Sequence, residues 1–207
     1  MKVYELRDPA HLRRRAHPWV DADADPSHRY YDFRRHPELI RSSLEDLLPW
    51  SGNASTETFF QLIEWLNGPE STLESNDCAF NGLSANDGSH SDLRFEASGR
   101  LMVLFRDLAC NTSPARVGNL AQSIARALSL ATPSLEEGVV GVSIVEVQVT
   151  TLPGPPARQR GQQVMLSFWA WGDDEGETLS NLNLTLVNLG DALRTASSHR
   201  PRQKRPL

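Results

Sequence analysis

Apolar residues recur along most of the chain at the spacing of either a helix or a strand. Helical spacing predicts helices over Thr56–Asn67, Pro114–Ala131 and Leu179–Leu193, each with one apolar face. Ser55 or Thr56 is the expected N-cap of the first helix, and a glycine-proline pair marks its end. The second helix begins with proline, which suits the first helical position because the missing N–H has no partner there.

Strands are predicted between these helices, where β-branched and other apolar residues dominate. They cover residues 73–83, 139–152 and 162–171, while residues 93–108 form a predicted β-hairpin that turns at Ser98-Gly99. The second arm of that hairpin, LMVLF, is apolar on both faces. This pattern is typical of a strand in the middle of a covered sheet.

The order of these elements indicates an α+β fold. A helix and a strand precede two successive strand–strand–helix (ββα) units, which pair naturally into one mainly antiparallel sheet with helices on one face. Such an arrangement is ferredoxin-like or a permuted variant of that plan. We therefore expect a single α+β domain over residues 55–196, an irregular N-terminal arm over 1–54 with room for one short helix at Pro37–Leu48, and a basic flexible tail over 197–207.

The charged residues are unevenly distributed between these parts. The whole chain has a net charge of −5, but residues 51–190 carry seven basic and 16 acidic side chains. Residues 191–207 carry five basic and one acidic. An acidic body disfavours nucleic acid as a partner and favours a cationic protein or small molecule. Arginine supplies 19 of the 21 basic residues, a bias typical of GC-rich bacterial genomes.

The sequence shows no sign of a membrane span or an export signal. No apolar run approaches the roughly 18–20 residues that cross a bilayer, and no apolar stretch follows the basic N-terminus. Cys78 and Cys110 are not spaced as metal ligands, either with each other or with histidine. We expect a cytoplasmic protein that uses no metal or other cofactor.

The segment GDDEGE, residues 172–177, admits two interpretations. In the first, Asp173 or Asp174 caps the last helix, and Glu177 lies three residues after Asp174, in capping-box register. In the second, the acids bind Mg²⁺ or Ca²⁺, but they lack the alternating spacing of a calcium loop and follow a strand. Capping is the favoured interpretation because it gives these acids a role without any ligand.

Two tryptophans precede this acidic segment. Trp169 and Trp171 lie two residues apart, so on a strand they share one face, and Phe168 lies on the other. If the tryptophans face away from the helices, they form an apolar patch suited to an arginine- or lysine-rich partner. The reverse orientation, with the tryptophans in the core, is an equal alternative. The acids beside such a patch are Asp173, Asp174 and Glu175.

Polar residues near strand ends are further candidates for binding. Arg106-Asp107 follows the predicted central strand, although a local ion pair and turn would explain these two residues as well. Asp77 lies in the strand before it. A pocket at the strand ends would be lined by Asp77, Arg106, Trp171 and Asp173.

No motif of a known catalytic class is present: the chain has no phosphate-binding glycine loop, no GxSxG and no HExxH. A nucleophilic Cys78 would need a base such as His90, and a buried structural cysteine is the favoured interpretation. Three functions remain. The first is a non-enzymatic protein-binding module with an acidic face, analogous in size and charge to bacterial immunity proteins that neutralise toxins. The second is a small enzyme or ligand-binding domain using the pocket above, and the third is a structural subunit, with homo-oligomerisation open.

Overall fold

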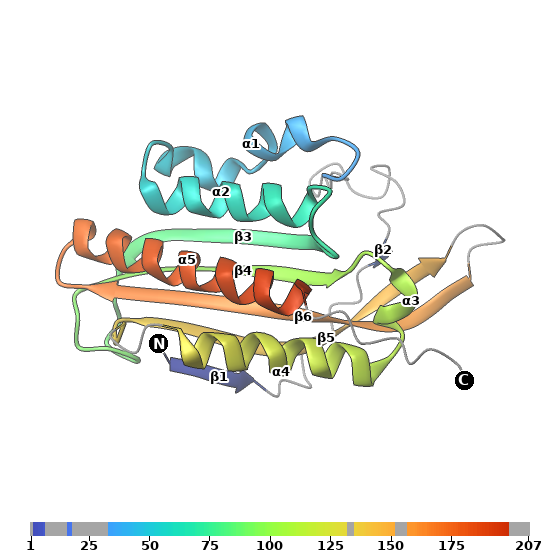
Figure 1. Ribbon diagram of the computed structural model, residues 1–207. Coiled ribbons are helices and arrows are strands. Elements are labelled where there is room, and N and C mark those ends of the chain that lie inside the picture. Colours follow the sequence, from blue (N-terminus) through green and yellow to red (C-terminus); the bar gives the residue numbers. More distant parts are fainter. Residues whose placement is uncertain (1, 7–15, 18–32, 132–134, 152–156, 199–207) are drawn as a thin grey trace.

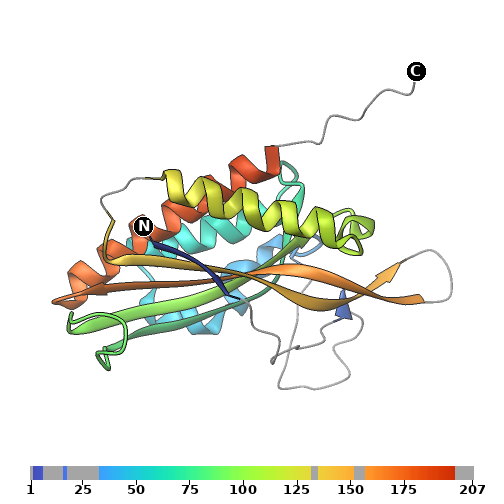
Figure 2. The same cartoon turned by 90° about the horizontal axis from the view of Figure 1, so that it is seen from below.

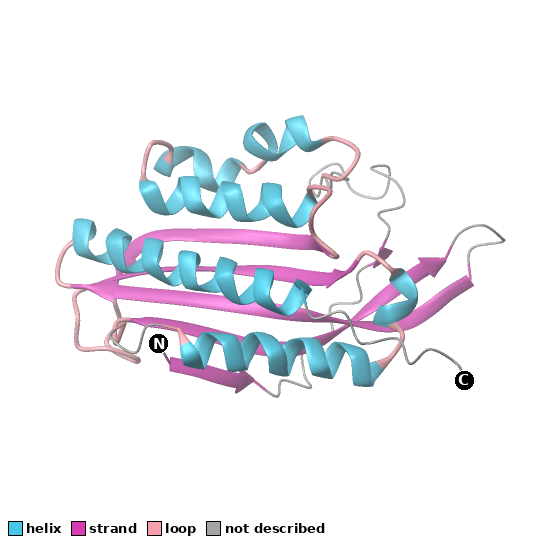
Figure 3. Ribbon diagram, viewed as in Figure 1, coloured by secondary structure: helices cyan, strands magenta, loops and turns pink. Residues whose placement is uncertain are grey.

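The computed structural model describes residues 2–6, 16–17, 33–131, 135–151 and 157–198. Figure 3 distinguishes the strands of the sheet from the helices that pack on it. The strands are β1 (Lys2–Leu6), β2 (Ala16–His17), β3 (Leu73–Ala85), β4 (Phe95–Phe105), β5 (Gly138–Thr151) and β6 (Ala157–Gly172). The helices are α1 (Ile40–Ser43), α2 (Ala54–Asn67), α3 (Leu108–Asn111), α4 (Pro114–Leu130) and α5 (Glu175–Ser198), and the 3-10 turns η1 (Pro37–Leu39) and η2 (Glu45–Trp50) flank α1.

The four long strands form one antiparallel sheet in the order β5-β6-β4-β3. The short strands β1 and β2 each pair with β5 in parallel. The central strands β4 and β6 run antiparallel, from Phe95 opposite Gly172 to Val103 opposite Val164. The predicted α+β class with an antiparallel sheet is confirmed. Because β4 and β6 run in opposite directions, the residues that follow them lie at opposite ends of the sheet.

Helices α2, α4 and α5 lie together on one face of the sheet, as Figures 1 and 2 show. The apolar stripe predicted for α4 is fully buried: Val117, Leu120, Ala121, Ile124 and Leu128. In α5, Leu182, Leu186, Leu189 and Leu193 are also buried, as their spacing predicts. These side chains and those of α2 form one core with the inward-facing residues of the sheet, among them Leu101, Val140, Leu166 and Phe168.

Strand β4 runs without a turn through Ser98 and Gly99, so the predicted hairpin turn at that point is wrong. A Cβ placed on Gly99 would lie 2.5 Å from the ring of Phe168 and 2.6 Å from the carbonyl oxygen of Ala79. Glycine is therefore needed here because a large neighbouring ring packs against the backbone. The connection between β3 and β4 lies at residues 86–94 instead.

The chain before α2 holds more structure than the sequence indicated. Strands β1 and β2 join the sheet in a region where no strand was predicted. The helix predicted at Pro37–Leu48 is replaced by η1, α1 and η2, which bury Ile40 and Leu47 against the core. The sequence pattern missed β1 and β2 because such short segments carry almost no periodicity of their own.

The ends of the long helices show smaller differences from prediction. The N-cap of α2 is Asn53 rather than Ser55 or Thr56, since the Asn53 side chain accepts a hydrogen bond from the backbone N–H of Ser55 at 3.0 Å. Gly68 ends the helix as predicted. At the other terminus, α5 continues to Ser198, and the remainder of the predicted basic tail lies outside the described residues.

Candidate binding site at the acidic end of the sheet

Three connections meet at one end of the sheet, which we call the acidic end. They are residues 86–94 between β3 and β4, residues 135–137 before β5, and residues 173–177, which lead from β6 into the first turn of α5. All three lie at the left of Figure 1. They carry two, two and four acidic residues, respectively, and Arg94 is their one arginine or lysine. Glu96, at the start of β4, adds a further carboxylate.

The tryptophans of β6 face away from the helices. Phe168 and Ala170 are fully buried in the helix-covered core, so the alternation of the strand places Trp169 and Trp171 on the other face. The alternative with Phe168 outside is therefore wrong. Trp171 is buried, and its indole N–H donates to the Glu96 carboxylate at 2.9 Å, whereas Trp169 is only half-buried.

These tryptophans line a pocket of about 820 Å³, which we call the large pocket. Residues of the β3–β4 connection and of the segment before β5 complete its wall, including His90, Asp92, Glu136 and Glu137. Within the described part of the chain, the carboxylates of Asp92, Glu136 and Glu137 make no hydrogen bond or ion pair. Their charge is thus available to a ligand in the pocket.

The acids that follow Trp171 cap helix α5, as the sequence indicated. Asp174 accepts a hydrogen bond from the backbone N–H of Glu177 at 2.8 Å, and Glu177 accepts one from the N–H of Asp173 at 2.7 Å. These reciprocal bonds resemble a capping box, displaced by one residue at the Glu177 end. Asp173, Asp174 and Glu175 are exposed and do not line the large pocket. Among the described residues, no group of three or more potential ligands is arranged to hold a metal ion.

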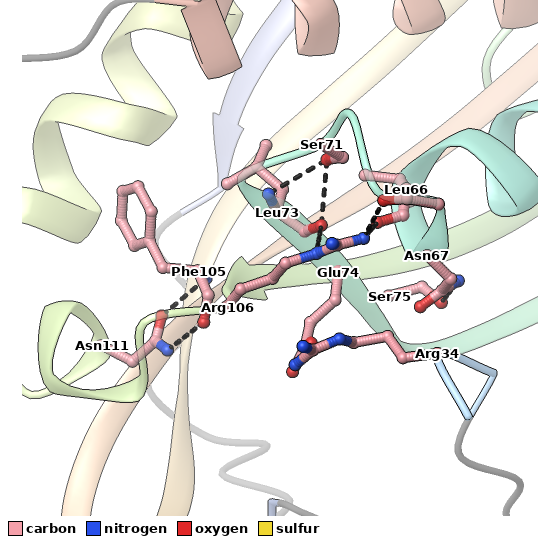
Figure 4. Close-up of polar contacts among 11 residues, drawn as sticks. Arg34, Leu66, Asn67, Ser71, Leu73, Glu74, Ser75, Phe105, Arg106 and Asn111 are labelled. Carbon is pink, nitrogen blue, oxygen red and sulfur yellow. Dashed lines mark hydrogen bonds and ion pairs between the residues drawn. The ribbon is translucent and has the colours of Figure 1, made fainter.

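Arg106 lies at the opposite end of the sheet, which we call the arginine end. Its guanidinium donates to the backbone carbonyls of Leu73 at 3.1 Å and Leu66 at 2.9 Å, and also to the carbonyl of Gly68 (Figure 4). Burial, aided by the nearby Arg34, lowers the pKa of Arg106. The role of this arginine is to fasten the connection between α2 and β3 onto the end of β4.

The polar pocket predicted from Asp77, Arg106, Trp171 and Asp173 is not formed. The pairing of β4 with β6 separates Arg106 from Trp171 by nearly the length of β4, roughly 30 Å at 3.4 Å per residue. Asp77 lies between these ends, opposite Met102, and pairs with Arg100 at 3.3 Å. The prediction failed because it placed the ends of two antiparallel strands side by side.

The remaining candidates have structural surroundings. Asp107 caps α3 through a hydrogen bond from the N–H of Ala109 at 3.2 Å, and its other oxygen accepts from the Cys110 thiol at 3.3 Å. Burial raises the pKa of Cys110, which disfavours a reactive thiolate. Cys78 packs against the helix-covered core, whereas His90 lines the large pocket on the other face, so they do not form a nucleophile–base pair.

Sequence reasoning found the tryptophans but missed the acids that surround them. Asp92 lies 77 residues before Trp169 in the chain, and Glu136 lies 33 before it. Only the strand pairing brings these segments together. One sequence feature could have indicated these acids: polar connections precede both β4 and β5. In the fold, the starts of these two strands meet at the end of β6.

Comparison of the chain with protein families, with characterised proteins and with solved structures finds no match. None of the described helices is long and apolar enough to cross a bilayer. The large pocket combines aromatic side chains with available charge, and both are features of binding sites.

Proposed function

We propose that this protein is a non-enzymatic binding module whose acidic end receives a basic segment of a partner protein. The observation that carries the proposal is the large pocket, where Trp169 and Trp171 lie beside the carboxylates of Asp92, Glu136 and Glu137. A tryptophan face attracts a guanidinium or ammonium group, worth about 0.5–2 kcal/mol depending on its exposure. Carboxylates at the rim add charge-assisted hydrogen bonds and attract a cationic partner over a longer range.

The charge balance of the body supports the same proposal. Residues 51–190 carry nine more acidic than basic side chains, and the three connections at the acidic end hold eight of the 16 acids. An inhibitor that masks a cationic protein, such as an immunity protein that neutralises a toxin, needs an anionic surface with an aromatic anchor. We place the protein in this functional class.

The test is an affinity pull-down from extracts of the source organism at low salt, with identification of the retained proteins. Three baits are compared: the wild type, Trp169→Ala, and the double variant Glu136→Gln with Glu137→Gln. A matched control, Glu70→Gln with Asp191→Asn, removes the same charge from two exposed positions outside the pocket. We expect the wild type and the control to retain one basic protein, and both site variants to retain at least about tenfold less.

The salt dependence of binding separates the contribution of the carboxylates from that of Trp169. At about 0.5 M salt the Glu136/Glu137 variant and the wild type should bind more nearly alike, because screening weakens the carboxylates, while Trp169→Ala should remain defective. Retention of the same partner by every variant, or of no partner by the wild type, would refute the proposed function.

We also interpret the fold as a permuted ferredoxin-like plan. The strand order β5-β6-β4-β3, with the second strand of each ββα unit at the centre, supports this interpretation. It is the order expected if a β-α-β-β-α-β chain of that plan begins at its second strand.

A further inference from the structure

Trp169 lines two neighbouring pockets rather than one. The large pocket extends from Trp169 to Val139 and Gly141 of β5, and residues 90–93 of the β3–β4 connection form another part of its wall. A second pocket of about 280 Å³, the small pocket, is lined by residues of the β3–β4 hairpin, including Ser84, Asp87 and Glu96. In the sheet, Trp169 stands between Ser98 of β4 and Val139 of β5. Trp169 is therefore a wall residue common to both pockets.

Each pocket has carboxylates of its own. Asp92, Glu136 and Glu137 line the large pocket, and Asp87 and Glu96 line the small one. His90 lines both. Among the described residues, the guanidinium groups that stack on rings lie over Phe60, Phe95 and Trp65, so the indole of Trp169 carries no internal cation.

We infer that the acidic end binds two arginine side chains of one partner segment, one on each side of Trp169. This inference rests on the proposed function and names the ligand chemistry that the site selects. Arginine suits it better than lysine, because a planar guanidinium can stack on the indole and still donate two parallel hydrogen bonds to a carboxylate. The carboxylates on both sides offset the repulsion between the two cations.

The dimensions of the Trp169 ring determine the spacing of the two arginines. Cations within about 6 Å of a ring centroid on its two faces lie roughly 7–12 Å apart. In an extended peptide, side chains at positions i and i+2 leave the backbone on the same side, about 7 Å apart. The matching motif is thus Arg-X-Arg in an extended segment.

Isothermal titration calorimetry with capped peptides of equal length tests this inference. The peptides contain one arginine, two arginines as Arg-X-Arg, two arginines separated by six residues, or Lys-X-Lys, each in a glycine-serine background at low salt. We expect Arg-X-Arg to bind at least about tenfold more tightly than the single-arginine peptide, and the widely spaced peptide to gain only about twofold, the statistical factor of two independent ligands.

Three variants test whether the small pocket and the Trp169 ring cause the gain in affinity. Asp87→Asn keeps the oxygen that accepts the Ser89 N–H at 2.9 Å but removes the charge. The affinity of Asp87→Asn for Arg-X-Arg should fall nearly to its affinity for the single-arginine peptide. Its affinity for the single-arginine peptide should differ from that of the wild type by less than twofold. Trp169→Phe should retain more Arg-X-Arg binding than Trp169→Ala, because a flat ring can still stack on a guanidinium.

The outcomes distinguish this inference from the function on which it depends. Equal affinity for peptides with one arginine and with Arg-X-Arg overturns the two-arginine site and leaves the proposed function standing. Tighter binding of Lys-X-Lys than of Arg-X-Arg also overturns it. Absence of binding by every peptide up to millimolar concentration overturns both.

Discussion

The two ends of the sheet use their charged residues in opposite ways. At the arginine end, the Arg106 guanidinium donates to three backbone carbonyls, and Asp107 caps a helix. At the acidic end, Asp174 and Glu177 are similarly used at the start of α5, but Glu136 and Glu137 border a pocket without an internal partner among the described residues.

Residue type and position at a strand end therefore do not identify a binding residue. Arg106 and Glu137 both lie just beyond a long strand, one after β4 and the other before β5. They differ in their hydrogen bonds: the Arg106 guanidinium donates to backbone carbonyls, whereas the Glu137 carboxylate has no partner among the described residues. An arginine that donates hydrogen bonds to three backbone carbonyls of one connection belongs to the fold, because such charge-assisted bonds stabilise that connection.

Removal of Arg106 should give the largest effect, and it tests whether this residue has a structural role at the arginine end. Arg106→Ala removes three charge-assisted hydrogen bonds to backbone carbonyls, although Leu73 still accepts from the Ser71 hydroxyl at 2.9 Å and Gly68 from the Ser71 N–H at 3.4 Å. We expect the variant to lower the free energy of unfolding by about 3 kcal/mol, measured by urea denaturation. Arg106→Lys should recover only part of this, because an ammonium group cannot span the three acceptors.

The matched control for that measurement is Arg116→Ala. Arg116 is exposed, and its guanidinium contacts the Cys110 sulfur at 2.8 Å. We expect less than about 1 kcal/mol of destabilisation from its removal. If Arg106→Ala were as stable as the wild type, Arg106 would be available for binding after all, and the contrast between the two ends would fail.

Asp174→Ala should give an intermediate effect, and it tests whether the acids that cap α5 differ in role from the acids that line the large pocket. Loss of its bond to the Glu177 N–H should cost about 1 kcal/mol of stability, measured in the same denaturation assay. Binding of a basic peptide should stay near the wild-type level. Asp173→Ala, whose side chain accepts no hydrogen bond from a described residue, should change stability less. Normal stability with abolished binding in Asp174→Ala would contradict the capping role.

The sequence predicted the features that depend on residues close together in the chain, and it missed those that depend on distant residues. The stripes of α4 and α5 and the alternation around Trp169 are local, so the sequence predicted the helices, the main strands and the face shared by the two tryptophans. The role of Gly99 depends on Phe168, 69 residues away, and the pocket depends on the pairing of β4, β5 and β6. Those features were missed or misplaced because no local pattern encodes the register of distant strands.

A smaller effect is expected where an acid is paired but still exposed, as in the contact between α1 and α2. Arg41 donates two hydrogen bonds to the Glu57 carboxylate, both at 2.8 Å, and Gln61 donates one more. These bonds, chiefly those from Arg41, lower the pKa of Glu57 from 4.5 to about 2. Because the folded-state pKa is depressed, the pair stabilises the fold above pH 4.5 and loses that contribution as the pH falls toward 2.

The magnitude of that contribution should be small, because both side chains are 48 % exposed and solvent screens their attraction. We expect the wild type to exceed Glu57→Gln by less than about 1 kcal/mol at neutral pH, with the difference vanishing near pH 2. Urea denaturation of both proteins across this range measures it. A difference that stays constant with pH would mean that Glu57 acts through packing rather than charge. An exposed carboxylate would then contribute nothing measurable through its charge even when it is hydrogen-bonded, in contrast to the partly buried guanidinium of Arg106.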